Sequence, residues 1–167
     1  MARRGRAAWL HDFDLTLAAD FRCTGEPAET LASHIALLAP LGVSIGLLWL
    51  RDPQVAPGAT VHPRIAALVR RGAALPIDPS TPALSCALLI VHRPDLVPNG
   101  LGAELRLHAE RTAILLATPL SDPTAQHLDT AAVTTALATC SRRPPVWCPT
   151  SPAVRASCQA HEPGLVL

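Results

Sequence analysis

The sequence predicts an α/β protein, a Rossmann-like three-layer sandwich built around a mostly parallel sheet. Short and almost wholly apolar segments recur along the chain, and 43–50 and 86–91 are the clearest of them. Such segments are typical of the buried strands of a parallel sheet. Segments with apolar side chains at helical spacing lie between them, and this alternation predicts layered α/β architecture. Proline- and glycine-rich stretches separate the two kinds of segment.

The first 50 residues predict a strand, a helix and a second strand. A short apolar run at 15–19 predicts the first strand, and the loop after it contains Thr24, a candidate N-cap, and Gly25. Residues 28–39 carry Leu31, Ile35 and Leu38 at helical spacing, which predicts a helix that ends before Pro40 and Gly42. The next strand is expected at 43–50, which completes a βαβ unit.

The rest of the chain continues the alternation, without an internal repeat. Strands are expected at 73–77, 86–91, 112–117 and 146–148. Helices are expected at 63–71 and 129–140, and Asp129 is the expected N-cap of the helix at 129–140. A short helical turn is expected within 95–103, and a last helix is expected to start within 152–157. His108 is expected on a short polar stretch before the strand at 112–117.

Composition restricts the possible functions. At 167 residues, the chain has the length of one domain that buries about two thirds of its unfolded surface. A content of 49% hydrophobic and 16% charged residues argues against charge-driven disorder, and a net charge of +1 gives no indication of a nucleic-acid partner. All 14 basic residues are arginine, which excludes chemistry that needs a lysine. An aromatic content of 3% argues against a base-stacking surface.

Neither a metal site nor a membrane span is expected. The five cysteines are far apart, and the sequence contains no C-x-x-C and no H-x-x-x-H pattern. The basic start of the chain is followed by only four apolar residues, too few for the core of a signal peptide. No stretch reaches the about 18 apolar residues of a membrane span. These observations predict a cytoplasmic protein without a metal ion.

Three loops follow predicted strands and are candidate binding segments, because ligands of such sheets lie beyond the carboxyl ends of the strands. These loops are 20–27, 51–62 and 92–100. The first contains four candidate substrate-binding residues: Asp20, Arg22, Thr24 and Gly25. Its glycine would let an anion approach a helix N-terminus. An ordinary strand-to-helix turn is the alternative, since the G-x-G-x-x-G motif is absent.

His92 is the candidate catalytic residue, because it directly follows the clearest strand and an imidazole suits a general base. His62, just before Pro63, is a further candidate for substrate binding. For both, the alternative is a surface histidine or one that is satisfied by neighbouring groups. His34 and His108 have no partner that the sequence identifies. The G-x-S-x-G nucleophile motif is absent.

A series of ordered landmarks resembles the N-terminal half of bacterial glycosyltransferases of the GT-B architecture. The landmarks span residues 12–158 and are Asp20-Phe21-Arg22 with Gly25, Leu41-Gly42-Val43, Ile45-Gly46-Leu47-Leu48, Val61-His62-Pro63-Arg64-Ile65, Leu88-Leu89-Ile90-Val91-His92, Leu128-Asp129, Val146-Trp147-Cys148-Pro149 and Pro152-Ala153-Val154-Arg155.

The resemblance implies a Rossmann-like domain on the acceptor side of a cleft between two domains. Gly25 would then approach the phosphates of a nucleotide-sugar donor, and His92 would face the reacting sugar. The donor is a substrate, held mainly by a C-terminal domain that 167 residues would lack, and no cofactor or metal is implied. Glu26 departs from the paired glycines of the family, and its carboxylate would repel a diphosphate.

Two other functions are compatible with the same residues. One is a non-catalytic α/β module that binds a small ligand or a partner chain. The other is a small nucleotide-binding regulator, which would need a phosphate-binding loop that Glu26 opposes.

Overall fold

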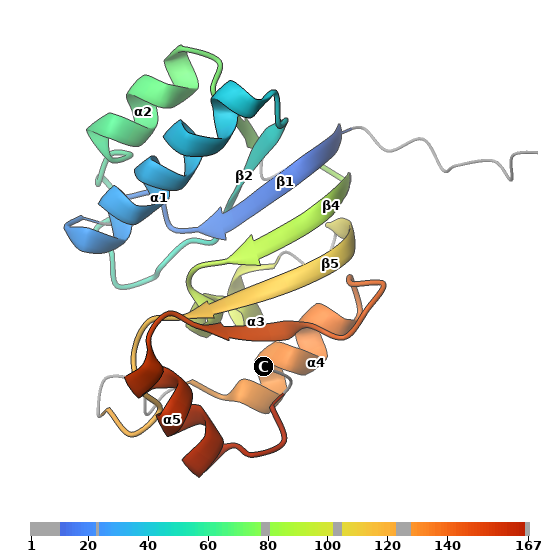
Figure 1. The fold of residues 1–167 in the computed structure, drawn as a ribbon. Coiled ribbons are helices and arrows are strands. Elements are labelled where there is room, and N and C mark those ends of the chain that lie inside the picture. Colours follow the sequence, from blue (N-terminus) through green and yellow to red (C-terminus); the bar gives the residue numbers. More distant parts are fainter. Residues whose placement is uncertain (1–10, 23, 78–80, 102–104, 123–127, 166–167) are drawn as a thin grey trace, which may run out of the picture.

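The computed structural model describes residues 11–22, 24–77, 81–101, 105–122 and 128–165. It confirms the predicted fold class, because its core is one six-stranded sheet in which every neighbouring pair is parallel (Figure 1). The strands are β1 (His11–Ala19), β2 (Ile45–Trp49), β3 (Leu75–Ile77), β4 (Ala83–Val91), β5 (Arg106–Leu116) and β6 (Val146–Pro149). Their order across the sheet is β3-β2-β1-β4-β5-β6, the order of the Rossmann fold.

Helices cover the two faces of the sheet unequally (Figure 1). The helices and 3-10 turns are α1 (Glu26–Leu38), η1 (Ala39–Leu41), α2 (Pro63–Arg70), η2 (Pro94–Leu96), α3 (Val97–Gly100), α4 (Thr130–Ala138) and α5 (Pro152–His161). Helices α1 and α2 lie on one face, over the half of the sheet that contains β1, β2 and β3, and α3 and α4 lie behind the other half. None of the helices in the described ranges is long and apolar enough to cross a membrane.

Two apolar cores lie on the two faces of the sheet and share its strands. The first core, on the α1/α2 side, buries Leu17 of β1 together with Leu31 and Ile35 of α1. The second core, on the α4 side, buries Ala18, the next residue of β1, and Trp147 of β6. Because successive side chains of a strand point to opposite faces, one strand can contribute to both cores.

Strand β5 begins earlier than the sequence predicted. The expected strand was 112–117, whereas β5 spans Arg106–Leu116 and includes His108, which is therefore not on a separate polar stretch. Glu110 and Arg111 are consecutive exposed residues in the middle of the strand, and they interrupt the alternation of buried and exposed positions. A pattern search that expects unbroken apolar residues stops at this interruption, although the parallel pairing with β4 continues on both sides of it.

The start of α1 also differs from the expectation. The N-cap residue is Gly25 with φ 71°, and no side chain caps the helix, so the predicted role of Thr24 as N-cap is wrong. The positive φ favours glycine at this position, because residues with a side chain rarely adopt such a backbone conformation. The corresponding prediction for α4 is confirmed, since the Asp129 side chain accepts a hydrogen bond from the Ala132 N–H at 2.8 Å.

Candidate functional site

The three predicted loops lie next to one another at the carboxyl edge of the sheet, because they follow the neighbouring strands β2, β1 and β4. The chain leaves β1 toward α1 on one face and leaves β4 toward α3 on the other face (Figure 1). Strand order therefore reverses between β1 and β4, and this reversal is where ligands bind in open α/β sheets. Asp20 directly follows β1, and His92 directly follows β4.

The Asp20 carboxylate is 1% exposed and accepts hydrogen bonds from three neighbouring residues. Arg22 donates from its backbone N–H at 2.9 Å and from Nε and Nη2 at 3.0 and 2.6 Å. The Asp52 backbone N–H and the Trp49 indole N–H donate at 2.8 and 3.3 Å. Burial raises the pKa of Asp20, but these donors and the Arg22 charge outweigh burial and lower the pKa to about 2.

Two arginines extend these contacts across the carboxyl edge. Arg22 Nη2 also donates to the Asp52 carbonyl at 3.1 Å, and its guanidinium lies 5.9 Å from the centre of the Trp49 ring. Arg93 donates to the Asp52 carboxylate at 3.0 Å and to both oxygens of Asp95 at 2.8 and 2.6 Å. We call Asp20, Arg22, Asp52, Arg93 and Asp95 the carboxylate–arginine network.

The network ties together the loops after β1, β2 and β4. The sequence nominated Asp20 and Arg22 as substrate-binding residues, and the structure places both at the predicted edge, hydrogen-bonded to each other and to the β2 loop. Asp52, Arg93 and Asp95 were not nominated, although each lies within four residues of the end of a predicted strand. A search for opposite charges directly after neighbouring strands would have found them.

His92 lies where the carboxyl edge meets α1. Its backbone N–H donates to the Ala18 carbonyl of β1 at 2.9 Å, which fixes the residue beside the first strand. The Nε2 atom is buried and has no hydrogen-bond partner among the described residues. The ring of His34, on α1, lies 5.4 Å away between ring centres. Burial, assisted by the His34 ring, lowers the pKa of His92 to about 4, so its imidazole is neutral at pH 7.

His62 lies at the N-terminal end of α1, although it precedes α2 in sequence. Its backbone N–H donates to the Phe21 carbonyl at 2.8 Å, and its Nε2 lies 3.7 Å from the Glu29 carboxylate. Its Nδ1 is buried and has no hydrogen-bond partner among the described residues. Arg64 also pairs with Glu29. Thr24 is exposed beside Gly25. All six residues that the sequence nominated therefore lie on the three loops of the predicted edge: Asp20, Arg22, Thr24, Gly25, His62 and His92.

The charges around Gly25 determine what its backbone amides can bind. Helix N-termini attract anions, but Glu26 and Glu29 occupy the first turn of α1 and oppose an incoming phosphate. The Arg51 guanidinium is exposed on the neighbouring loop, 5.5 Å from the centre of the Trp49 ring. The described residues contain no group of three His, Cys, Asp or Glu side chains that could hold a metal ion. Among the described residues of this edge, the buried polar side-chain atoms without a hydrogen-bond partner are His62 Nδ1 and His92 Nε2.

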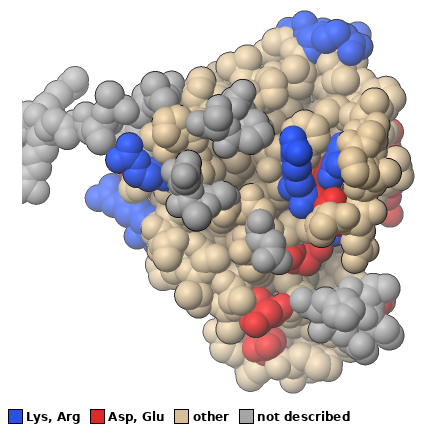
Figure 2. Space-filling view, turned by 180° about the vertical axis from the view of Figure 1, so that it is seen from behind, with Lys and Arg blue, Asp and Glu red and all other residues tan. Residues whose placement is uncertain are grey.

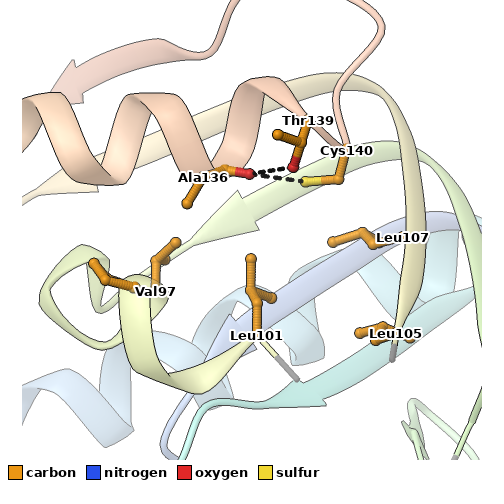
Figure 3. Close-up of a pocket in the computed structure, with 8 residues that line it drawn as sticks. Val97, Leu101, Leu105, Leu107, Ala136, Thr139 and Cys140 are labelled. Atoms are coloured by element: carbon orange, nitrogen blue, oxygen red, sulfur yellow. Dashed lines mark hydrogen bonds between the residues drawn. The ribbon is translucent and has the colours of Figure 1, made fainter. Parts of the chain in front are cut away.

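An apolar cavity of about 240 Å³ lies between α3 and α4 (Figure 3). Leucines 101, 105 and 107 form much of its wall, and Thr139 and Cys140 stand at its polar side. The Thr139 hydroxyl donates to the Ala136 carbonyl at 2.7 Å, so this polar group is already satisfied. None of the described residues that line the cavity is charged, and we assign it no chemistry.

The face opposite to the view of Figure 1 shows acidic and basic side chains interspersed on a largely uncharged surface (Figure 2). The described residues of this face form no extended field of one sign. Comparisons of the chain with models of protein families, with curated proteins and with solved structures find no match. The functional argument therefore depends on the geometry of the carboxyl edge.

Proposed function

We propose that this chain is the acceptor-side, Rossmann-like domain of a GT-B type glycosyltransferase, which transfers a sugar from a nucleotide-sugar donor to an acceptor hydroxyl. The observation that carries the proposal is His92: a neutral imidazole at the ligand-binding edge whose buried Nε2 has no hydrogen-bond partner in the described part of the chain. Buried polar atoms are nearly always paired in native proteins, and the two left unpaired at this edge among the described residues are His62 Nδ1 and His92 Nε2, which supports a role for His92 toward a bound group.

His92 would act on the acceptor. As the acceptor oxygen forms its bond to the anomeric carbon, its proton passes to Nε2, and the bond from that carbon to the nucleotide phosphate breaks, with its electron pair leaving on the phosphate. A pKa of about 4 makes the free imidazole a weak base. The negative charge of a bound donor would raise this pKa, so the base would be stronger in the donor complex than in the free chain.

The donor would be held mainly by a second domain. Glu26 and Glu29 make the N-terminal end of α1 a poor diphosphate site, although Gly25 leaves its backbone open. Gly25 would then only border the phosphates, with Thr24 and His62 beside it. In this proposal the nucleotide sugar is a substrate, and neither a metal nor a cofactor takes part.

A non-catalytic α/β module is the second candidate, and the carboxylate–arginine network favours it. Asp20, Arg22, Asp52 and Arg93 are paired with one another, which is the arrangement expected of residues that fasten loops. Such a module would bind a small ligand or a partner chain at the same edge without turnover.

Calorimetric titration with a panel of nucleotide sugars and acceptors separates the two candidates. It is done on this chain and on any longer form that carries a second α/β domain. In the longer form we expect donor binding and turnover, and His92→Ala should lower turnover about 100-fold or more. His161→Ala is the matched control, since this exposed histidine on α5 should leave turnover unchanged.

Three results decide the matter. Failure of the longer form to bind any nucleotide sugar would overturn the glycosyltransferase proposal. Unchanged turnover in a folded His92→Ala variant would remove His92 from the mechanism. Ligand binding without turnover in any form would favour the non-catalytic module.

A further inference from the structure

The cavity between α3 and α4 is separate from the carboxyl edge. Helices α3 and α4 lie on the sheet face opposite to α1, the helix whose His34 approaches His92 (Figure 1). Three segments contribute to its wall: α3 with Val97, the start of β5 with Leu107, and the end of α4 with Ala136 (Figure 3). The cavity is therefore a feature of the tertiary fold, formed where the two helices meet the sheet.

The described residues of the cavity wall range from buried to exposed. Val97 and Leu107 are 1% and 8% exposed, and both belong to the second core. Pro98 and Thr139 also line the cavity and are exposed to solvent. The cavity thus opens to solvent on one side and reaches core side chains on the other, so a ligand has a path of entry.

The polar side chains of the wall already have hydrogen-bond partners within α4. The Thr139 hydroxyl donates to the Ala136 carbonyl at 2.7 Å, and the Cys140 thiol donates to the Leu137 carbonyl at 3.2 Å. None of the described lining residues is charged. A charged ligand would lose its hydration here without gaining a partner of opposite charge, so the wall selects neutral molecules.

The volume of about 240 Å³ defines the size of the ligand. Native interiors contain few voids larger than a water molecule, so a cavity of this size is unusual. Water is a poor occupant of apolar cavities, because each molecule needs about two to four polar partners. An apolar cavity of about 150 Å³ can hold benzene, and in proportion this one holds about six to ten carbon atoms.

We propose that this cavity binds a small, neutral, apolar molecule, with the size of one aromatic ring or a short hydrocarbon chain. The ligand contacts α3 and α4 together and replaces water against Val97, Leu101 and Leu107. Removal of apolar surface from water, on the ligand and on the wall, drives the binding. No covalent bond forms or breaks, so the site adds binding without catalysis.

The size of the ligand also sets the expected affinity. The binding free energy of a small ligand is limited by its number of atoms, so a single ring binds weakly even in a well-formed site. For benzene we expect a Kd of about 0.1–10 mM. Benzoate carries the same ring with a carboxylate, and it should bind at least about tenfold more weakly, because the described wall residues offer no positive charge.

Titration of the chain with benzene and with benzoate, followed by the NMR shifts of its backbone amides, tests the proposal. The largest shifts with benzene should fall on wall residues such as Val97, Leu107 and Ala136. Ala136→Leu should raise the Kd for benzene at least about tenfold, because the longer side chain occupies the cavity. Ala138→Leu is the matched control, since Ala138 is exposed on the same helix and does not line the cavity.

The proposal fails if benzene at its solubility limit shifts no amide of the wall, or if it shifts mainly residues of the carboxyl edge. It also fails if Ala136→Leu and Ala138→Leu have the same effect, or if benzoate binds as tightly as benzene. Circular dichroism checks that each variant is folded, and Leu101→Trp, which fills the cavity from α3, decides the question if Ala136→Leu does not fold. These outcomes are independent of the glycosyltransferase proposal.

Discussion

At the carboxyl edge, individual charged residues stabilise the loops by satisfying one another. Asp20 is the clearest case, because a carboxylate that is nearly inaccessible to water has donors from Arg22, Trp49 and Asp52. Removing its charge would leave the Arg22 guanidinium, itself only 8% exposed, without its counter-ion. The cost of one uncompensated buried charge exceeds that of losing an exposed ion pair.

We expect Asp20→Asn to lower the free energy of unfolding by about 3 kcal/mol at pH 7, measured by urea denaturation. Glu110→Gln, which removes an exposed carboxylate paired with Arg142, should cost less than about 1 kcal/mol. A cost for Asp20→Asn as small as that of the control would mean that the network contributes little to stability.

The same carboxyl makes stability depend on pH. Its pKa is about 2 in the folded chain and about 3.9 when unfolded, so its contribution is complete above about pH 5. As pH falls below about 5, the unfolded state takes up a proton first, and about 2 kcal/mol of stability is lost by pH 2. Asp20→Asn should lack this part of the acid dependence.

At the scale of elements, close packing between strands explains why Gly46 lies in β2. A Cβ atom at this position would lie 2.9 Å from two ring carbons of Phe13 and from Cδ1 of Ile77. The Ile77 methyl group can rotate away, but the Phe13 ring is buried against β2 and has little room to move. Phe13 thus fills, from β1, the space that a side chain of β2 would otherwise take.

We expect Gly46→Ala to destabilise the chain by about 1–3 kcal/mol, since it overpacks the contact with Phe13. Gly58→Ala is the control, because no atom lies within 4 Å of the added Cβ, and its effect should stay within about 0.5 kcal/mol. Thermal unfolding followed by circular dichroism measures both. Equal effects of the two substitutions would contradict the packing argument.

At the scale of the whole molecule, the two cores should unfold together. They share the strands of one sheet, and neighbouring residues of β1, Leu17 and Ala18, lie in different cores. Loss of side-chain packing in one core therefore also destabilises the core on the opposite face of the sheet. Single domains of this size commonly unfold in one cooperative transition.

We expect one transition, with the same midpoint by tryptophan fluorescence and by circular dichroism. Ile35→Ala in the first core and Leu137→Ala in the second, both 0% exposed, should each shift this midpoint and cost about 2–5 kcal/mol. Two separate transitions, each sensitive to only one of the substitutions, would show that the cores are independent.

The sequence by itself determined the fold class and most of the elements. Apolar runs such as 86–91 and the helical spacing of Leu31, Ile35 and Leu38 depend on local periodicity, which a single chain displays directly. The same periodicity located the strands and therefore the loops that follow them. Because ligands of open α/β sheets bind beyond the carboxyl ends of the strands, these loops indicated the edge where Asp20 and His92 lie. It failed at β5, where Glu110 and Arg111 interrupt the pattern, and at the N-cap of α1.

Only the tertiary structure decided which groups meet. The pairing of Arg93 with Asp52 joins residues 41 positions apart, and the approach of His34 to His92 depends on where α1 crosses the sheet. Strand order, which makes β1 and β4 neighbours, is likewise set by packing between distant segments. Local patterns carry no information on such contacts, because their energies arise from side chains that come together only when the whole sheet has formed.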